Sequence, residues 1–227
     1  IKQFQPNHFD YIIVDESHRA GAASYLIFLE YFKPRFILGM TATPERTDGA
    51  DIYKLFDFNL AYEIRLQRAL EENMLCPFHY FGITDLTVDG AEIDDKSGFN
   101  KLTSDRRVEH VIENMELYGC DDGIVRGLVF CSRIEECRTL AQKFNERGIP
   151  SVALSGSDPE SSREDAIKRL EADPEDSEKL DYVFTVDIFN EGVDIPKVNQ
   201  IVMLRPTQSA IIFVQQLGRG LRKLKER

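Results

Sequence analysis

The sequence lacks several features that would place the protein in a membrane, in a secretory pathway or among metal-binding folds. No apolar run approaches the roughly 18 to 20 residues that a membrane span needs, and the N-terminal residues contain neither a basic nor an apolar signal segment. The four cysteines have no paired CxxC spacing, so neither a zinc site nor a disulfide framework is indicated. These absences predict a cytoplasmic protein without a membrane partner.

An excess of positive charge is also missing. The chain has 28 Lys and Arg against 39 Asp and Glu, a balance of −11, which argues against a protein that holds nucleic acid by its overall charge. The charges are unevenly distributed, because residues 205–227 contain six bases and one acid, whereas residues 158–181 contain ten acids and four bases. We therefore expect any site for a polyanion to be a focused patch.

The length and composition are those of a folded protein with more than one domain. Its 227 residues are 42% hydrophobic and 30% charged, which is ordinary for a globular chain, and the length suits two domains. The sequence begins at Ile1 rather than Met, and its end follows a predicted helix. We expect it to be part of a longer protein.

Alternating strands and helices predict an α/β fold with parallel sheets. The first strand, within residues 9–17, has a continuous apolar run at 11–14 that predicts burial on both faces. The run of elements after it is a helix at 24–31, a strand at 36–43, a helix at 52–56, a strand at 61–66, a helix at 67–73 and a strand at 76–82. Residues 1–84 are thus predicted to form a first domain.

A segment rich in Asp and Gly, residues 85–103, is interpreted as a linker, and residues 104–227 as a second domain. Ser104 is expected to cap a helix that carries a stripe of apolar residues. Strands are predicted at 127–132, 151–156, 182–187 and 200–205, and helices at 133–148, 161–173 and 209–224. Gly148 is expected to end the first of these helices.

The first strand ends in two acids, Asp15 and Glu16. Ligands of open α/β sheets bind at the carboxyl ends of the strands, where one acid can hold Mg²⁺ on nucleotide phosphates and the next can orient the attacking water. A solvated acid pair is the equally open alternative. Thr41 and Thr43 end the next strand and can hydrogen-bond His18 or the carboxylates, although TAT by itself is also typical of a turn.

Three polar side chains of the segment QQLGRGLR are predicted to lie on one helix. Gln215, Arg219 and Arg222 belong to it, and the two arginines share a face because they are three residues apart. A guanidinium stays protonated and donates two parallel hydrogen bonds, which suits the charge that develops on a transferred phosphoryl group. The alternative is a solvated basic helix end, favoured by the helix dipole.

The segment FTVDIFNEGVDIP supplies the fourth candidate. Gly192 permits close approach of the backbone to a ligand, and Asp194 can accept a hydrogen bond from a ribose hydroxyl. A simple turn before Pro196 is the alternative. The functional interpretation is favoured because the four segments occur together, each at the end of a predicted strand or on the last helix.

Together these segments resemble the superfamily-two helicases and translocases, which are nucleic-acid-dependent ATPases with two RecA-like lobes. The resemblance covers nearly the whole chain. VDESH is similar to motif II, GMTATPERTDG to motif III, LVFCSR to motif IV, TVDIFNEGVDIP to motif V and QQLGRGLR to motif VI. The sequence that flanks the motifs is similar to that of the branch that contains type III restriction Res subunits and related DEAD/DEAH-box helicases.

The resemblance implies ATP and Mg²⁺ as cofactors, bound between two RecA-like lobes, and a nucleic-acid track that is DNA, with RNA open. It also implies association with nuclease or restriction-modification subunits. The implied roles are Asp15 for the metal; Glu16 as catalytic base with Arg219 and Arg222 as arginine fingers; Gly192, Asp194 and Gln215 at the nucleotide; His18, Thr41 and Thr43 in coupling; and Ser155, Arg163 and Arg205 at the nucleic acid.

One element of the family pattern is missing, because no G-x-x-x-x-G-K-[ST] phosphate loop occurs in these residues. We therefore expect the first lobe to be truncated at its N-terminus and to have uncovered apolar surface. The missing N-terminal part of the same protein is then a required partner, and we expect the chain not to hydrolyse ATP by itself. The alternative function is a non-catalytic RecA-like scaffold in a restriction or repair complex. A dinucleotide oxidoreductase is disfavoured because GxGxxG is also missing.

Overall fold

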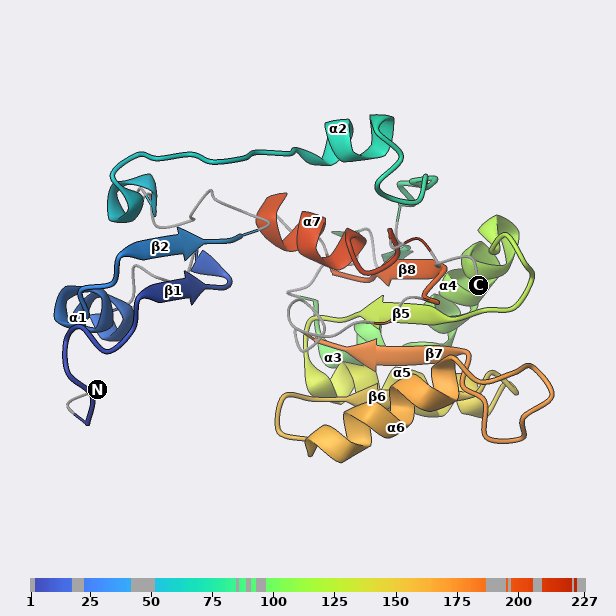
Figure 1. Cartoon of the computed structure of the whole chain (residues 1–227). Helices are drawn as coiled ribbons and strands as arrows, with labels where there is room; N and C mark the ends of the chain where they lie inside the picture. The colour runs from blue at the N-terminus through green and yellow to red at the C-terminus, as the bar shows by residue number, and fades with distance from the viewer. Residues whose placement is uncertain are drawn as a thin grey trace. The chain divides into compact units, whose positions relative to one another are not determined.

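The computed structural model of the chain divides into two compact units, Ile1–Leu66 and Gln67–Arg227 (Figure 1). The structure describes residues 3–17, 23–41, 52–84, 86–88, 91–92, 97–186, 195, 197–205, 210–221 and 223. Within these ranges, no helix combines the length and the apolar character that crossing a bilayer requires.

The first unit is built on two parallel strands, β1 (Tyr11–Val14) and β2 (Phe36–Gly39), connected through helix α1 (Ala23–Tyr31). Tyr11 is paired with Phe36, and the register continues to Val14 and Gly39. Ile12 and Val14 pack on Phe32, with further aromatic and aliphatic side chains around them. The predicted strand, helix and parallel strand are therefore present.

The prediction that β1 is buried on both faces was wrong. Ile12 and Val14 are 7% and 5% exposed, whereas the alternating residues Tyr11 and Ile13 are 72% and 64% exposed. Successive side chains of a strand point to opposite faces, and the described residues cover one face of this sheet. The other face carries Tyr11, Ile13 and the half-exposed Phe36, which agrees with the expectation of uncovered apolar surface.

Two further predicted strands, at 61–66 and 76–82, have no ladder partner among the described residues. A 3₁₀ helix, η2 (Ile52–Phe56), precedes the first of them, and helix α2 (Leu66–Glu71) follows it. The second segment is held by one backbone hydrogen bond, from the Cys76 N–H to the Leu221 carbonyl at 2.8 Å, and by side-chain contacts. The ring of Tyr80 packs on Phe213 at 5.7 Å, and that of Phe81 stacks on Tyr118 at 4.0 Å.

The predicted linker contains regular structure within its described part. Strands β3 (Thr87–Val88) and β4 (Ala91–Glu92) form a short antiparallel pair, and helix α3 (Phe99–Leu102) follows. Other residues of 85–103 lie outside the described ranges. The domain boundaries at 84 and 104 therefore stay a prediction.

The second unit is a parallel four-stranded sheet in the order β6-β7-β5-β8, flanked by helices (Figure 1). Its strands are β5 (Gly127–Phe130), β6 (Ser151–Leu154), β7 (Tyr182–Thr185) and β8 (Gln200–Met203). Its four longest helices within the described ranges are α4 (Asp105–Tyr118), α5 (Ile134–Asn145), α6 (Glu160–Leu170) and α7 (Ala210–Leu217). The strands pair side by side over their whole length, first residue with first residue, so their carboxyl ends form one edge of the sheet.

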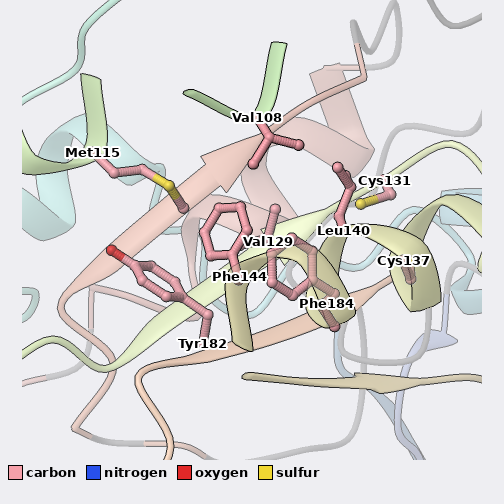
Figure 2. Packing of buried hydrophobic residues seen from close by; sticks show 10 residues of the cluster. Val108, Met115, Val129, Cys131, Cys137, Leu140, Phe144, Tyr182 and Phe184 are labelled. Atoms are coloured by element: carbon pink, nitrogen blue, oxygen red, sulfur yellow. The ribbon is translucent and has the colours of Figure 1, made fainter. Parts of the chain in front are cut away.

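Two apolar clusters hold the helices on opposite faces of this sheet. Figure 2 shows the cluster beneath α4 and α5, in which the ring of Phe144 lies 4.9 Å from that of Phe184 and 5.8 Å from that of Tyr182. The second cluster joins α6 to the other face and includes the fully buried Leu128 and Leu170. Parallel strands buried on both faces are typical of α/β proteins, and the fold class predicted from the sequence is confirmed.

The predicted helix ends of the second unit are also present. The Ser104 hydroxyl caps α4 by accepting the N–H of Arg107 at 3.4 Å. After α5 the chain turns at Gly148, whose φ of +77° is in the left-handed region that glycine adopts without a Cβ penalty.

Replacing Gly127 by Ala is expected to destabilise the protein by about 1–3 kcal/mol. A Cβ at Gly127 would overlap the ring of Tyr182 on the neighbouring strand. That ring cannot move easily, because its hydroxyl donates to Gln200 at 2.7 Å and the ring packs in a T-shaped contact on that of Phe144. Urea unfolding measures the loss, with Gly82→Ala as the control, since a Cβ at Gly82 meets nothing within 4 Å. Equal stability of the two variants would contradict the prediction.

Candidate nucleotide and nucleic-acid site

The predicted site residues divide into those that the structure places and those that it does not. His18, Thr43, Gly192, Asp194 and Arg222 lie outside the described residues. Of the others, Arg163 lies on α6, Gln215 and Arg219 belong to α7 and the turn after it, and the rest follow strands. Each unit contributes its own set.

In the first unit the acid pair lies directly after β1. The Asp15 side chain is exposed, and its Oδ1 accepts the N–H of Glu16 at 2.9 Å. The turn is tied to the end of β2, because the Ser17 N–H donates to the Met40 carbonyl at 2.8 Å and the Met40 N–H donates to the Val14 carbonyl at 2.9 Å. Thr41 follows Met40, so the structure brings Asp15, Glu16 and Thr41 to one edge of the sheet.

Glu16 has a φ of +48°, which is uncommon for a residue other than glycine. A left-handed backbone at a non-glycine residue costs about 1–3 kcal/mol and persists only where its surroundings hold it. Here the hydrogen bonds of Val14 and Ser17 to Met40 fix the chain on both sides of Glu16. Strain of this kind gathers at functional sites, which makes Glu16 the most distinctive residue of this edge.

The acid pair fits Mg²⁺ better than it fits a metal held by protein ligands alone. Within the described ranges, no three His, Cys, Asp or Glu side chains come together as a ligand group. Mg²⁺ is usually bound through one or two carboxylates, with waters and substrate phosphates as its remaining ligands. The exposed carboxylate of Asp15 at a strand end is a donor of this type.

In the second unit, Ser155 follows β6 and Arg205 lies two residues after β8, so both occupy the carboxyl edge of the sheet. The Ser155 loop is organised by Asp158. Asp158 Oδ2 accepts the Ser155 N–H at 2.6 Å and its hydroxyl at 2.8 Å. These two hydrogen bonds favour the ionised carboxylate and lower the pKa of Asp158.

Arg163 braces this loop from α6. Its Nη2 donates to the carbonyls of Gly156 at 2.8 Å and Asp158 at 3.1 Å. Its guanidinium therefore holds the loop backbone, whereas a contact of Arg163 with nucleic acid stays a prediction.

Acidification is expected to loosen the Ser155 loop. Because the pKa of Asp158 is lowered from its ordinary value of 3.8, the loop hydrogen bonds are fully present above that value and are lost as the pH falls through the folded-state pKa. The amide resonance of Ser155, followed by NMR from neutral pH downward, should stay constant until the pH falls below 3.8 and then shift. Asp158→Asn is the control, and an identical titration in that variant would assign the shift to another group.

The predicted helix over 209–224 is shorter in the structure, and the placement of Arg219 on its face was wrong. Helix α7 ends at Leu217, and Arg219 lies in the following turn, where its N–H donates to the Gln216 carbonyl at 3.2 Å. Gly218 and Gly220 flank Arg219, and glycine costs about 1 kcal/mol more than alanine in a helix. Gln215 is on α7 as predicted.

The neighbouring Gln216 has a completely buried side chain that the sequence reasoning passed over. Neither polar atom of its amide has a hydrogen-bond partner among the described residues. Buried amides are nearly always paired, so an orphaned one marks a place where a ligand or another segment supplies the partner.

Arg107 and Glu136 were also missed. They form a buried ion pair between α4 and α5, at 3.1 Å. A signal for them exists in the sequence, because each is a single charge within an apolar helical stripe. Arg107 precedes Val111 and Met115 at intervals of four, and Glu136 precedes Leu140 and Phe144 in the same way.

A groove of about 900 Å³ lies elsewhere on the second unit, between the segment from Cys76 to Ile83, α4 and β8. None of the predicted site residues that the structure describes lines it. We therefore place the candidate site at the carboxyl ends of the strands, where the charged and hydroxyl side chains gather, and not in this groove.

Comparison with known proteins identifies the family. The helicase conserved C-terminal domain matches residues 108–223, about half of the chain, and the res subunit of type III restriction enzymes matches residues 1–46. The chain belongs to the superfamily-two helicases that carry the helicase conserved C-terminal domain.

Individual relatives agree with this assignment. The chain is 24% identical over 234 residues to IRC3 of Saccharomyces cerevisiae, named as an ATP-dependent helicase, and covers 33% of its length. Among solved structures, the chain is similar to an HsdR fragment of a type I restriction enzyme from Vibrio vulnificus YJ016. The match covers 97% of the chain and 42% of the HsdR fragment, with a TM-score of 0.70 and 24% identity.

A third match is the ATP-dependent type ISP restriction-modification enzyme LlaBIII bound to DNA. The match covers 99% of the chain and 18% of LlaBIII, with a TM-score of 0.67 and 19% identity. At this identity the two structural matches establish the RecA-like α/β fold. The chain thus spans less than half the length of each of these three proteins.

Proposed function

We propose that the natural protein containing this chain is an ATP-dependent helicase or translocase that acts on DNA. The observation that carries the proposal is the acid pair after β1, in which Glu16 is held in a left-handed backbone conformation beside Asp15. The family supports it, since its relatives include ATP-dependent helicases. DNA is favoured over RNA because LlaBIII, a structural neighbour, was solved bound to DNA.

In this proposal the residues of the first unit act on the phosphates. Asp15 holds Mg²⁺, which neutralises phosphate charge when it is bound. Glu16 orients the attacking water and accepts its proton. His18, Thr41 and Thr43 couple hydrolysis to nucleic-acid binding.

The residues of the second unit act on the nucleotide and on the nucleic acid. Arg219 and Arg222 stabilise the charge of the transferred phosphoryl group. Gly192, Asp194 and Gln215 contact the nucleotide. At the carboxyl edge of the sheet, the loop of Ser155 with Arg163 and the segment of Arg205 contact the phosphate backbone of the nucleic acid, and restriction-enzyme subunits are the proposed protein partners.

We further propose that these 227 residues do not hydrolyse ATP by themselves. The phosphate loop supplies a cradle of backbone N–H groups and a lysine for the β- and γ-phosphates, and the sequence contains no match to it. Without these donors, Asp15 has little bound phosphate against which to hold a metal.

Steady-state ATP hydrolysis tests both proposals. It is measured for the natural protein and for the 227-residue chain, each alone and with double-stranded DNA, single-stranded DNA or RNA. We expect turnover in the natural protein, stimulation by DNA, and none in the chain alone. Stimulation by RNA only would overturn the assignment of DNA, and turnover by the chain would overturn its predicted inactivity.

The same measurement separates the motor from a scaffold. The negative net charge and the missing phosphate loop favour a non-catalytic module within a restriction or repair complex. In that case the natural protein would show no turnover with any nucleic acid, and the coding sequence upstream of Ile1 would contain no GxGKT-type loop.

A further inference from the structure

A buried ion pair lies next to the carboxyl edge of the second unit's sheet. The side chains of Arg107, on α4, and Glu136, on α5, are 1% and 0% exposed, and Arg107 Nη1 donates to Glu136 Oε1 at 3.1 Å. Two charges removed from water are costly unless they are paired and their remaining hydrogen-bonding groups are satisfied. The contacts that satisfy them connect this pair to the ends of two strands.

The Arg107 guanidinium fixes the end of β8. Its Nη2 donates to the Leu204 carbonyl at 3.1 Å, while Nη1 also donates to the Leu102 carbonyl at 2.9 Å. The N–H of Leu204 donates to the Phe130 carbonyl at 2.9 Å. Both backbone groups of Leu204 are therefore held, and the next residue along the chain is Arg205.

The Glu136 carboxylate fixes the end of β5 in the same way. Its second oxygen, Oε2, accepts the N–H of Ser132 at 3.0 Å. Ser132 lies two residues after β5, as Arg205 lies two residues after β8, and Phe130 and Met203 are partners in the sheet. One ion pair thus determines where the chain leaves two neighbouring strands.

We propose that Arg107 and Glu136 are positioning residues for nucleic-acid binding. They fix the Leu204 backbone so that the guanidinium of Arg205 meets a phosphate of the bound strand. An apolar pair of the same volume would fill the space equally well, but it would offer no partner to the backbone groups of Leu102, Ser132 and Leu204. The inference rests on the proposed function, in which Arg205 contacts nucleic acid.

The test is a double-mutant cycle between Arg107 and Arg205 in the natural protein. Arg107→Lys keeps the charge beside Glu136, but a single ammonium cannot replace the planar fork that reaches Leu204 and Leu102 as well. Affinity for a labelled single-stranded DNA of about 30 nucleotides is measured at salt concentrations of about 50 and 200 mM. Leu140→Ala, in the apolar stripe of α5, is the control for general loss of stability.

We expect Arg205→Ala to weaken binding and to reduce the salt dependence by about one phosphate contact. Arg107→Lys should weaken binding about fivefold in the wild-type background and less than about twofold in the Arg205→Ala background, because its effect passes through Arg205. Leu140→Ala should leave the affinity unchanged at a temperature where the protein is folded.

The remaining outcomes overturn the inference in distinguishable ways. If Arg205→Ala weakens binding and Arg107→Lys does not, the positioning role fails and the proposed function stands. If neither affects binding, Arg205 is not a nucleic-acid residue and both assignments fail. If Arg107→Lys weakens binding equally in both backgrounds, or if Leu140→Ala weakens it as much, the pair is a structural element of the core.

Discussion

Replacing Glu16 by Gln in the natural protein is expected to lower ATP turnover by a factor of about 10²–10⁴, while ATP binding persists. Glutamine has nearly the same size and hydrogen-bonding reach as glutamate, so the strained turn after β1 remains, but the amide cannot accept a proton from the attacking water. Turnover is measured with saturating DNA, and binding with a fluorescent ATP analogue.

The matched control is Glu30→Gln, which removes the same charge from an exposed position on α1. This variant should hydrolyse ATP at the wild-type rate. Wild-type turnover in Glu16→Gln would remove Glu16 from its proposed role, and loss of ATP binding together with turnover would indicate that the side chain is needed for the shape of the site.

Replacing Arg107 by Met is expected to destabilise the protein by about 3–5 kcal/mol, the largest single effect on stability that we predict. The substitution leaves the Glu136 carboxylate buried, with the Ser132 N–H as its remaining hydrogen-bond partner among the described residues. It also removes the guanidinium that donates to the carbonyls of Leu102 and Leu204. Urea unfolding, followed by circular dichroism, measures the change.

The double variant Arg107→Met with Glu136→Leu should be more stable than Arg107→Met alone. It has no unpaired buried charge, and apolar pairs of similar volume often replace buried ion pairs at little cost. It should remain less stable than the wild type, because a buried backbone group without a partner costs about 1–3 kcal/mol. A double variant that loses the sum of the two single effects would show that the pair is not coupled.

Much of the fold followed from local patterns. The alternation of apolar runs and amphipathic stretches predicted the four strands of the second unit, and Ser104 indicated where α4 begins. The acids and hydroxyls that follow strands pointed to the edge where Asp15, Glu16 and Thr41 lie, because the carboxyl ends of parallel strands always share an edge.

Other features depended on partners that a local pattern does not name. The run at 11–14 predicted a strand but not that Tyr11 and Ile13 are exposed, since burial depends on what covers each face. The segment 76–82 has the composition of a strand but finds aromatic partners instead of a ladder. Gly218 and Gly220 end α7 before Arg219, although the motif around them is continuous.

The sequence by itself determined the class of this protein, because its motifs and their order depend on residues close together in the chain. Only the tertiary structure decided which charges are buried and what they hold. Along the chain, Glu136 lies 29 positions after Arg107, and Leu204 lies 68 positions after Glu136. The contacts of Arg107 with both residues form because two helices pack on one sheet and remove the charged pair from water. A buried charge must find its partners through the fold, and those partners determine where Ser132 and Arg205 leave their strands.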